Sequence, residues 1–182
     1  VRGLQLMAEI YARQSRDSQA IQSLLEAVAL IEQNQLDSNN PWGPKLLWEP
    51  VNQLARLRLK SRELPGAASL LEVALRVANE CQDIRGEMTV RGNYGTLFAE
   101  QGNLEAAIRS VQTAIKLAVS VNDLQAHSKL LHNLGLMHLR QRRRDLAQNC
   151  FQSSYDLADQ LDWREGIAMN ASQLRVLTQE EE

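Results

Sequence analysis

Residues 93–118 read NYGTLFAEQGNLEAAIRSVQTAIKLA, and residues 133–158 read NLGLMHLRQRRRDLAQNCFQSSYDLA. Placed one above the other, the two stretches carry the same residue at several places, always 40 positions apart. The matched pairs include Asn93 and Asn133, Gly95 and Gly135, Ala107 and Ala147, Leu117 and Leu157, and Ala118 and Ala158. A fixed period of this size is typical of arrays in which one unit stacks on copies of itself. We therefore expect a repeat protein.

The same register extends toward the start of the chain, so that most of the sequence is one unit copied four times. The second copy is marked by Ala55, Ala67, Leu71 and Ala74, and the first by Ala8, Tyr11, Ala20, Leu24 and Ala27. Two antiparallel helices approach to about 8–10 Å only where the side chains between them are small. We therefore expect helix crossings at Ala8, Ala55, Gly95 and Gly135, which would face Ala20, Ala67, Ala107 and Ala147.

Composition favours an all-α protein without a charged field that would attract nucleic acid or a membrane. The 182 residues contain only 4% aromatics, nine glycines and four prolines, and the net charge is −2. Two cysteines, Cys81 and Cys150, form no metal or disulfide pattern, which predicts free thiols in a reducing, cytoplasmic compartment. No signal peptide or membrane span is visible, and Val1 already lies inside a helical pattern. We therefore expect a piece of a longer protein.

Hydrophobic periodicity predicts eight helices in four pairs and then a ninth. The expected repeats cover about 1–36, 44–82, 84–122 and 124–162, with a lone helix at 164–178, all in one domain over 1–178, and an acidic tail at 179–182. Pro65 suits the first turn of a helix, Asn103 suits an N-cap, and residues 37–44 carry turn chemistry. The ninth helix is either a cap or the first half of a truncated fifth repeat.

The motifs resemble the tetratricopeptide repeat, whose signature places Leu-Gly and Tyr on a first helix and Ala and Phe on a second. The clearest copies here are Tyr94-Gly95, Phe98, Ala107 and Val111, and then Leu134-Gly135, His138, Ala147 and Phe151. The usual period is about 34 residues, so a period of 40 implies longer helices. Long repeats of this kind resemble those of kinesin light chains, bacterial peptide-pheromone receptors and regulatory domains of bacterial signalling proteins. The resemblance covers about 1–162 and implies a right-handed α-solenoid of antiparallel helix pairs that acts as a protein–protein interaction scaffold.

Helical geometry predicts which side of the first helices forms the binding face. A residue two positions before a crossing glycine lies about 200° around the helix axis, which puts Asn93 and Asn133 opposite the partner helix. Neighbours of these positions in all four repeats give the concave face a net charge of +3, from Arg2, Arg13, Arg56, Lys60, Lys129 and Arg140 against Glu9, Glu49 and Glu100. The candidate peptide-binding residues are Gln53, Arg56, Lys60, Asn93, Thr96, Lys129, His132, Asn133, Leu136 and Arg140. We expect a basic groove for an extended, acidic peptide.

The amides Gln53, Asn93 and Asn133 suit a peptide backbone, because each carboxamide offers a donor and an acceptor. The alternative is that these amides bond to neighbouring helices. The carboxylate clamp known from cochaperones is not reproduced, because Gln5 and Glu9 occupy its places, so the tails of chaperones are not expected partners.

Other residues carry weaker signals. The basic run at 140–144 falls on a turn and is interpreted as a solvated cap. His127, His132 and His138 do not share a helical face, as metal ligands would, and His138 is expected to fill the packing slot of Tyr11 and Phe98. No conjunction of nucleophile, base and oxyanion donor emerges, so neither an enzyme nor a cofactor is expected. The alternative function is a regulatory, sensor or self-association module of a larger signalling protein, such as a kinase or transcription activator, and homo-oligomerisation stays open.

Overall fold

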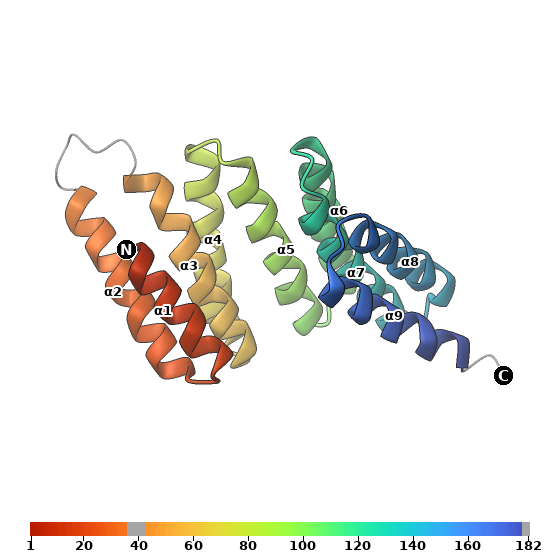
Figure 1. Cartoon of the computed structure of the whole chain (residues 1–182). Coiled ribbons are helices and arrows are strands. Elements are labelled where there is room, and N and C mark those ends of the chain that lie inside the picture. Colours follow the sequence, from red (N-terminus) through yellow and green to blue (C-terminus); the bar gives the residue numbers. More distant parts are fainter. Residues whose placement is uncertain (36–42, 180–182) are drawn as a thin grey trace. The chain divides into compact units, whose positions relative to one another are not determined.

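The computed structural model describes residues 1–35 and 43–179, which form nine α-helices and no strand (Figure 1). Most of the predicted loop at 37–44, with Trp42, and most of the predicted acidic tail lie outside the described residues. The helices form two compact units, Val1–Asn93 and Tyr94–Glu182, each of which is described by itself. None of the described helices is long and apolar enough to cross a bilayer.

The first unit holds four complete helices and the beginning of a fifth. They are α1 (Arg2–Arg13), α2 (Asp17–Gln35), α3 (Gly43–Lys60), α4 (Leu64–Glu80) and the first part of α5 (Ile84–Glu100). Helix α1 packs on α2, α2 on α3, and α3 on α4. Pro65 lies in the first turn of α4, as its missing N–H predicts. The indole Nε1 of Trp48 donates a 2.8 Å hydrogen bond to Asp83, which ties α3 to the start of α5.

The second unit holds the end of α5 and four more helices, α6 (Leu104–Ser120), α7 (Leu124–Arg140), α8 (Arg144–Gln160) and α9 (Arg164–Gln179). Helix α6 packs on α7, α7 on α8, and α8 on α9. The predicted N-cap at Asn103 is confirmed, because its side-chain oxygen accepts a 3.1 Å hydrogen bond from the Ala106 N–H. Asp123 caps α7 in the same way through the Ala126 N–H, at 3.0 Å.

The turns explain why the repeat measures 40 residues. A residue with positive φ follows each of the helices α3 to α8, and these residues recur every 20 positions: Arg62, Gln82, Gly102, Asn122, Arg142 and Asp162. The residue after each one returns its N–H to a carbonyl near the helix end, as Asn103 does to Phe98 at 2.9 Å. This is the Schellman closure, in which a left-handed residue ends a helix. Each helix of α4–α8 therefore has 17 residues, and two helices with their turns make one repeat.

The predicted helix crossings are confirmed within both units. Ala8 and Ala55 are buried in the first unit, and the four facing alanines of the second helices, Ala20, Ala67, Ala107 and Ala147, have no exposed surface. In the second unit a Cβ atom added to Gly95 would lie 2.3 Å from Val111 Cγ2, and one added to Gly135 would lie 2.7 Å from the Phe151 ring. These distances are too short for any side chain, so the second helices pack directly on the glycines. The described helices thus form an all-α solenoid of helix pairs.

Candidate functional site

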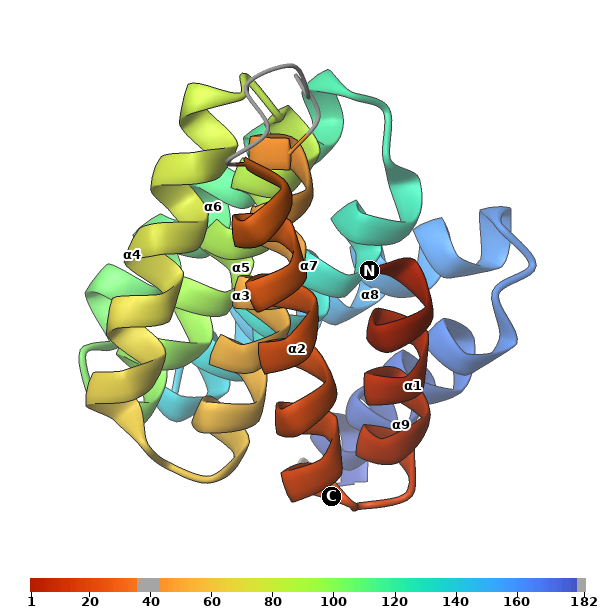
Figure 2. The same ribbon diagram turned by 90° about the vertical axis from the view of Figure 1, so that its left-hand side faces the viewer.

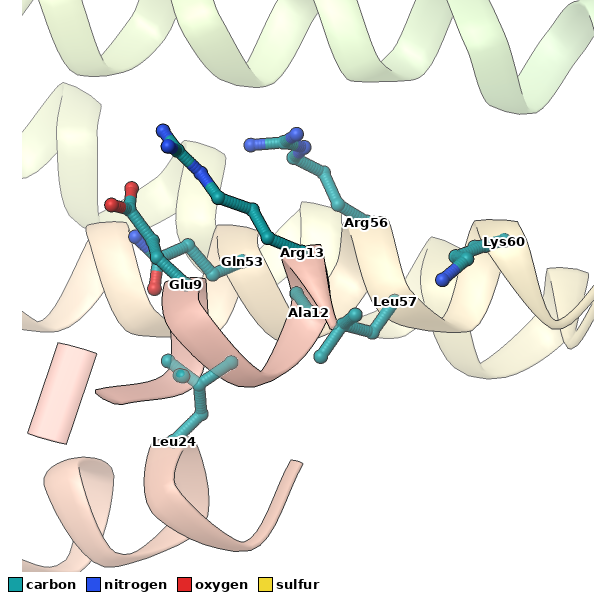
Figure 3. Close-up of a pocket in the computed structure, with 9 residues that line it drawn as sticks. Glu9, Ala12, Arg13, Leu24, Gln53, Arg56, Leu57 and Lys60 are labelled. Carbon is teal, nitrogen blue, oxygen red and sulfur yellow. The ribbon is translucent and has the colours of Figure 1, made fainter. Parts of the chain in front are cut away.

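A groove of about 530 Å³ lies between α1, α2 and α3 in the first unit (Figure 3). We call it the α1–α3 groove. Its apolar lining comes from Ala8, Ala12, Leu24 and Leu57, and its polar lining comes from Glu9, Arg13, Gln53, Arg56 and Lys60. Three of the predicted binding residues, Gln53, Arg56 and Lys60, are therefore brought together in one place. Arg13, which lies on the predicted concave face, joins them.

Two guanidinium groups in this groove are available to a ligand. Arg13 of α1 and Arg56 of α3 are exposed and extend to the same side of the groove (Figure 3). Among the described residues, no carboxylate forms an ion pair with either of them. Lys60 is already engaged, because its ammonium group donates a 2.9 Å hydrogen bond to Asp17. Since an exposed ion pair is weak, Lys60 still adds positive charge to this end of the groove.

Gln53 offers an unsatisfied acceptor in the wall of the same groove. Its side-chain Oε1 is buried and accepts no hydrogen bond from the described residues. Leaving a buried acceptor unpaired costs roughly 1–3 kcal/mol. A ligand that brought an N–H group to this oxygen would recover that cost.

The groove continues into a second hollow of about 430 Å³ with the opposite charge. Glu9 and Gln53 line both hollows, and the second one adds Arg2, Gly3, Gln5, Leu6 and Glu49. Gln5 donates a 3.4 Å hydrogen bond to the Glu49 carboxylate. The first unit thus has positive charge near Arg13, Arg56 and Lys60 and negative charge near Glu9 and Glu49. The face that was predicted to be basic has a basic end and an acidic end in this unit.

Asn93 takes part in a bond between helices. Its Nδ2 donates a 2.7 Å hydrogen bond to the Oδ1 of Asn52, which is buried in α3. The alternative interpretation, in which the amides bond to neighbouring helices, therefore holds for this amino group. Sequence reasoning missed Asn52, although it stands next to Gln53 and could have been identified as a second polar residue on that face.

In the second unit, the two predicted cations interact with neighbouring side chains. Arg140 donates to the Glu100 carboxylate at 3.2 Å and to the Ala99 carbonyl at 3.3 Å. The Lys129 ammonium lies over the Trp163 ring, 5.1 Å from its centroid, in a cation–π contact. Each of these cations is partly satisfied within its own unit, unlike Arg13 and Arg56.

His132 lies in the interior of the second unit and is only 7% exposed. Its Nδ1 is 2.9 Å from the Oδ1 of Asn170, and because that oxygen can only accept, Nδ1 carries the proton. Asn170 in turn donates to Ser154 Oγ at 2.8 Å, and Ser154 Oγ donates to the Ser128 carbonyl at 2.7 Å. This buried network of His132, Ser128, Ser154 and Asn170 joins α7, α8 and α9. Of these four residues, only His132 was predicted from the sequence to have a functional role, and it was expected in the peptide-binding groove.

The remaining predicted residues of the second unit, Thr96, Asn133 and Leu136, are half-buried. Leu136 packs against the core cluster of Ala147, Phe151 and Leu177. Asn133 makes no hydrogen bond through its carboxamide in the described part of the chain and is therefore available to a ligand.

Cys150 and His138, two of the titratable groups singled out from the sequence, have shifted pKa values. Burial raises the pKa of the Cys150 thiol, which disfavours the nucleophilic thiolate. Burial, followed by the nearby Arg143 charge, lowers the pKa of His138. His138 is buried, as expected for the packing slot, and its Nδ1 finds no hydrogen-bond partner in the described residues. Within residues 1–35 and 43–179, no group of three or more His, Cys, Asp or Glu side chains is placed to hold a metal ion.

Comparisons with known proteins agree with this geometry. Residues 86–160 match the family model of the tetratricopeptide repeat. The fold is similar to the crystal structure of BtubC (BKLC) from P. vanneervenii, with a TM-score of 0.74 and 21% identity over 88% of this chain and 65% of that one. It is also similar to a putative kinesin light chain from Podosopora anserina with nearly identical TPR-like repeats, with a TM-score of 0.67 and 12% identity over 98% and 91% of the two chains. No curated protein matches the sequence.

The protein is thus an all-α solenoid of tetratricopeptide-like helical hairpins. Residues 86–160 match the tetratricopeptide-repeat model, and the fold of the chain is similar to that of a putative kinesin light chain. The resemblance read from the sequence is confirmed. A solenoid of this kind is in general a scaffold for protein–protein interaction. The chain spans slightly less than two thirds of the BtubC chain.

Proposed function

We propose that this scaffold binds an extended, acidic peptide, and that the α1–α3 groove is its main binding site. The observation that carries the proposal is the pair of exposed guanidinium groups, Arg13 and Arg56, beside the buried and unpaired Oε1 of Gln53. Guanidinium groups bind carboxylates through two parallel hydrogen bonds. The groove therefore combines a site for acidic side chains with an acceptor for a backbone N–H.

The groove also gives the peptide a direction. Acidic residues belong at the end that holds Arg13, Arg56 and Lys60, whereas Glu9 and Glu49 favour neutral or basic residues at the other end. Leu24 and Leu57, which form part of the apolar lining of the groove, suit one apolar side chain of the peptide.

Other predicted residues have smaller parts in the proposal. The side-chain oxygen of Asn93 can accept a hydrogen bond from a peptide N–H, since only the side-chain amino group bonds to Asn52. In the second unit, Thr96 and Asn133 are the residues best suited to contact a peptide, and Lys129 and Arg140 would do so while keeping their present contacts. His132 and Leu136 support this surface from within the helix packing.

The proposal is tested with an array of short synthetic peptides that carry a Glu-Glu pair between randomised residues, and a matched array that carries Gln-Gln. The protein is expected to bind the Glu-Glu array in preference. For the best peptide, Arg13→Gln combined with Arg56→Gln should lower the affinity about tenfold or more and flatten its dependence on salt. Arg76→Gln, on the exposed surface of α4, is the matched control and should leave binding unchanged. Equal capture of the two arrays, or full binding by the double variant, would exclude this site.

A further inference from the structure

Two guanidinium groups of the α1–α3 groove lack an anionic partner, although they come from different helices. Arg13 lies on α1 and Arg56 on α3, and Figure 2 looks onto α1 and α2 with α3 behind them. Glu9 is the carboxylate in the lining, and among the described residues it forms no ion pair with either arginine. Lys60, which pairs with Asp17, adds a third cation on the same face of α3 as Arg56. The groove therefore gathers positive charge that its own residues neutralise only in part.

The repeat shows how an equivalent place looks when its anion is built into the chain. Arg13, Lys60, Glu100 and Arg140 each stand five positions after the crossing residue of their helix, as Arg140 does after Gly135. In the second unit, Arg140 of α7 donates a 3.2 Å hydrogen bond to Glu100 of α5. In the first unit, the equivalent residues of α1 and α3 are Arg13 and Lys60, so both are cations. An anion from a ligand would therefore take the place that the Glu100 carboxylate has in the second unit.

The geometry of guanidinium groups favours a phosphoryl group as this anion. A guanidinium group binds an anion best through two parallel hydrogen bonds. A carboxylate has two oxygens, and one guanidinium group occupies both of them. A phosphoryl group on a side chain has three terminal oxygens and a charge of about −1.5 to −2 at pH 7. Because Arg13 and Arg56 extend to the same side of the groove, one phosphoryl group can pair with both (Figure 3).

An extended peptide does not supply the same charge through two neighbouring carboxylates. Successive side chains of an extended chain point to opposite faces. One of two neighbouring glutamates would therefore face the groove, and the other would face away from it. A single phosphorylated side chain carries both charges on the face that enters the groove. The peptide residue that matches this groove is therefore a phosphorylated one.

We propose that the acidic residue recognised by this groove is a phosphoserine or phosphothreonine of the partner peptide. This inference rests on the proposed function and narrows the class of its ligand. The phosphoryl oxygens accept hydrogen bonds from Arg13 and Arg56, and Lys60 adds positive charge beside them. A backbone N–H of the peptide donates to the buried Oε1 of Gln53, which lies one turn before Arg56 on the same face of α3.

The test adds a third peptide array to the Glu-Glu and Gln-Gln arrays, with phosphoserine-Ala in the place of Glu-Glu. The phosphoserine-Ala and Glu-Glu pairs carry nearly the same charge, so net charge alone does not separate them. The full chain is expected to bind the best phosphoserine peptide about tenfold more tightly than its Glu-Glu equivalent, as measured by fluorescence anisotropy. If the chain prefers Glu-Glu over Gln-Gln but binds phosphoserine-Ala no more tightly than Glu-Glu, this inference is wrong and the proposed function stands. If it prefers neither acidic array over Gln-Gln, both are wrong.

Single substitutions test whether both arginines contact one group. Arg13→Gln and Arg56→Gln should each abolish the roughly tenfold preference for phosphoserine-Ala over Glu-Glu, because one guanidinium group can pair with either anion. The control Arg76→Gln, on α4, should keep the full preference. Since all three side chains are exposed, circular dichroism should show an unchanged thermal midpoint. If a glutamine variant is unfolded, the lysine variant of that position replaces it, since lysine keeps the charge but not the two parallel donors. A full preference in either groove variant would place the phosphoryl group elsewhere and overturn the inference.

A last comparison distinguishes a peptide from other carriers of phosphate. Inorganic phosphate, and vesicles of equimolar phosphatidylcholine and phosphatidic acid, are added as competitors at the phosphate concentration at which unlabelled phosphopeptide displaces half of the labelled peptide. Neither should displace it, because neither supplies a backbone N–H for Gln53 or an apolar side chain for Leu24 and Leu57. Equal displacement by either competitor would assign the groove to phosphate anions or to a membrane surface, and it would overturn the inference.

Discussion

Arg56 of α3 and Leu136 of α7 occupy the same place in the repeat, but their surroundings differ. Arg56 is exposed beside Arg13 in the α1–α3 groove, without a carboxylate partner among the described residues. Leu136 is half-buried and packs against the core of the second unit. The position that can contact a ligand in one unit therefore stabilises the packing of helices in the other.

A second pair of equivalent positions shows the same division. Asn52 and His132 each hydrogen bond to the next first helix, to Asn93 and Asn170 respectively. The bond to Asn170 is part of a fully buried network, whereas the bond to Asn93 is only partly buried. The second unit thus fixes its last helix through buried polar side chains, whereas the equivalent bond of the first unit is partly buried. A place in the repeat does not by itself decide whether a residue binds a ligand.

The largest expected effect concerns the helix crossing, which has Ala55 in the first unit and Gly135 in the second. A Cβ atom at Gly135 would lie within 2.9 Å of three atoms of the rigid Phe151 ring, so Gly135→Ala should destabilise the second unit by about 3 kcal/mol. Urea unfolding followed by the fluorescence of Trp163, in a background that carries Trp42→Phe and Trp48→Phe, measures this. Adding Phe151→Leu, which copies Leu71 of the first unit, should restore part of the loss. An unchanged midpoint in the single variant would mean that α7 and α8 can move apart at low cost.

The next effect distinguishes the two interhelical bonds. Asn170→Val removes the partner of His132 and of Ser154 in a fully buried site and should cost about 2–3 kcal/mol, whereas Asn93→Val should cost about 1 kcal/mol. Denaturant midpoints of the two variants provide the comparison. If both variants lost the same stability, burial would not be what separates the two units here.

The helices and their crossings could be predicted from the sequence because they depend on local patterns. The interval between Gly95 and Ala107, which recurs between Gly135 and Ala147, predicted the hairpin, and the N-cap at Asn103 followed from its side chain. The position of His132 could not be predicted in this way, because the angle around a helix gives the direction of a side chain but not its partner. That partner, Asn170, comes from the next first helix. The sequence predicted Gln53, Arg56 and Lys60 on one face. It could not predict that Arg56 has no carboxylate partner among the described residues, because this depends on which charges lie near it in space.

A reciprocal exchange sharpens the comparison between Arg56 and Leu136. Arg56→Leu should weaken the binding of an acidic peptide about tenfold while the free energy of unfolding stays within about 0.5 kcal/mol. Leu136→Arg should instead destabilise the second unit by about 1–2 kcal/mol, since it places a charge against the cluster of Phe151 and Leu177. Peptide anisotropy and urea unfolding are measured on both variants. A loss of stability in Arg56→Leu would show that the arginine also has a structural role.

The smallest expected effect is a pH dependence of the free energy of unfolding. It arises at the repeat position that Arg58 occupies in the first unit and His138 in the second. The first unit has Arg58 there, which stays charged and pairs with Glu63 near the surface, and the second has the buried His138. Because burial and Arg143 lower the pKa of His138, the unfolded chain takes up its proton at a higher pH than the folded chain does. The stability that neutral His138 contributes is therefore complete above the ordinary histidine pKa of about 6.5 and is lost as the pH falls from there through the lower pKa of the folded state. His138→Phe, which copies Phe98, should reduce the fall in unfolding free energy between about pH 7 and pH 5 without abolishing it, because burial lowers the pKa of His127 as well. If urea unfolding of His138→Phe showed the wild-type pH dependence, His138 would be able to charge in place, and its buried Nδ1 would have to reach a partner on protonation.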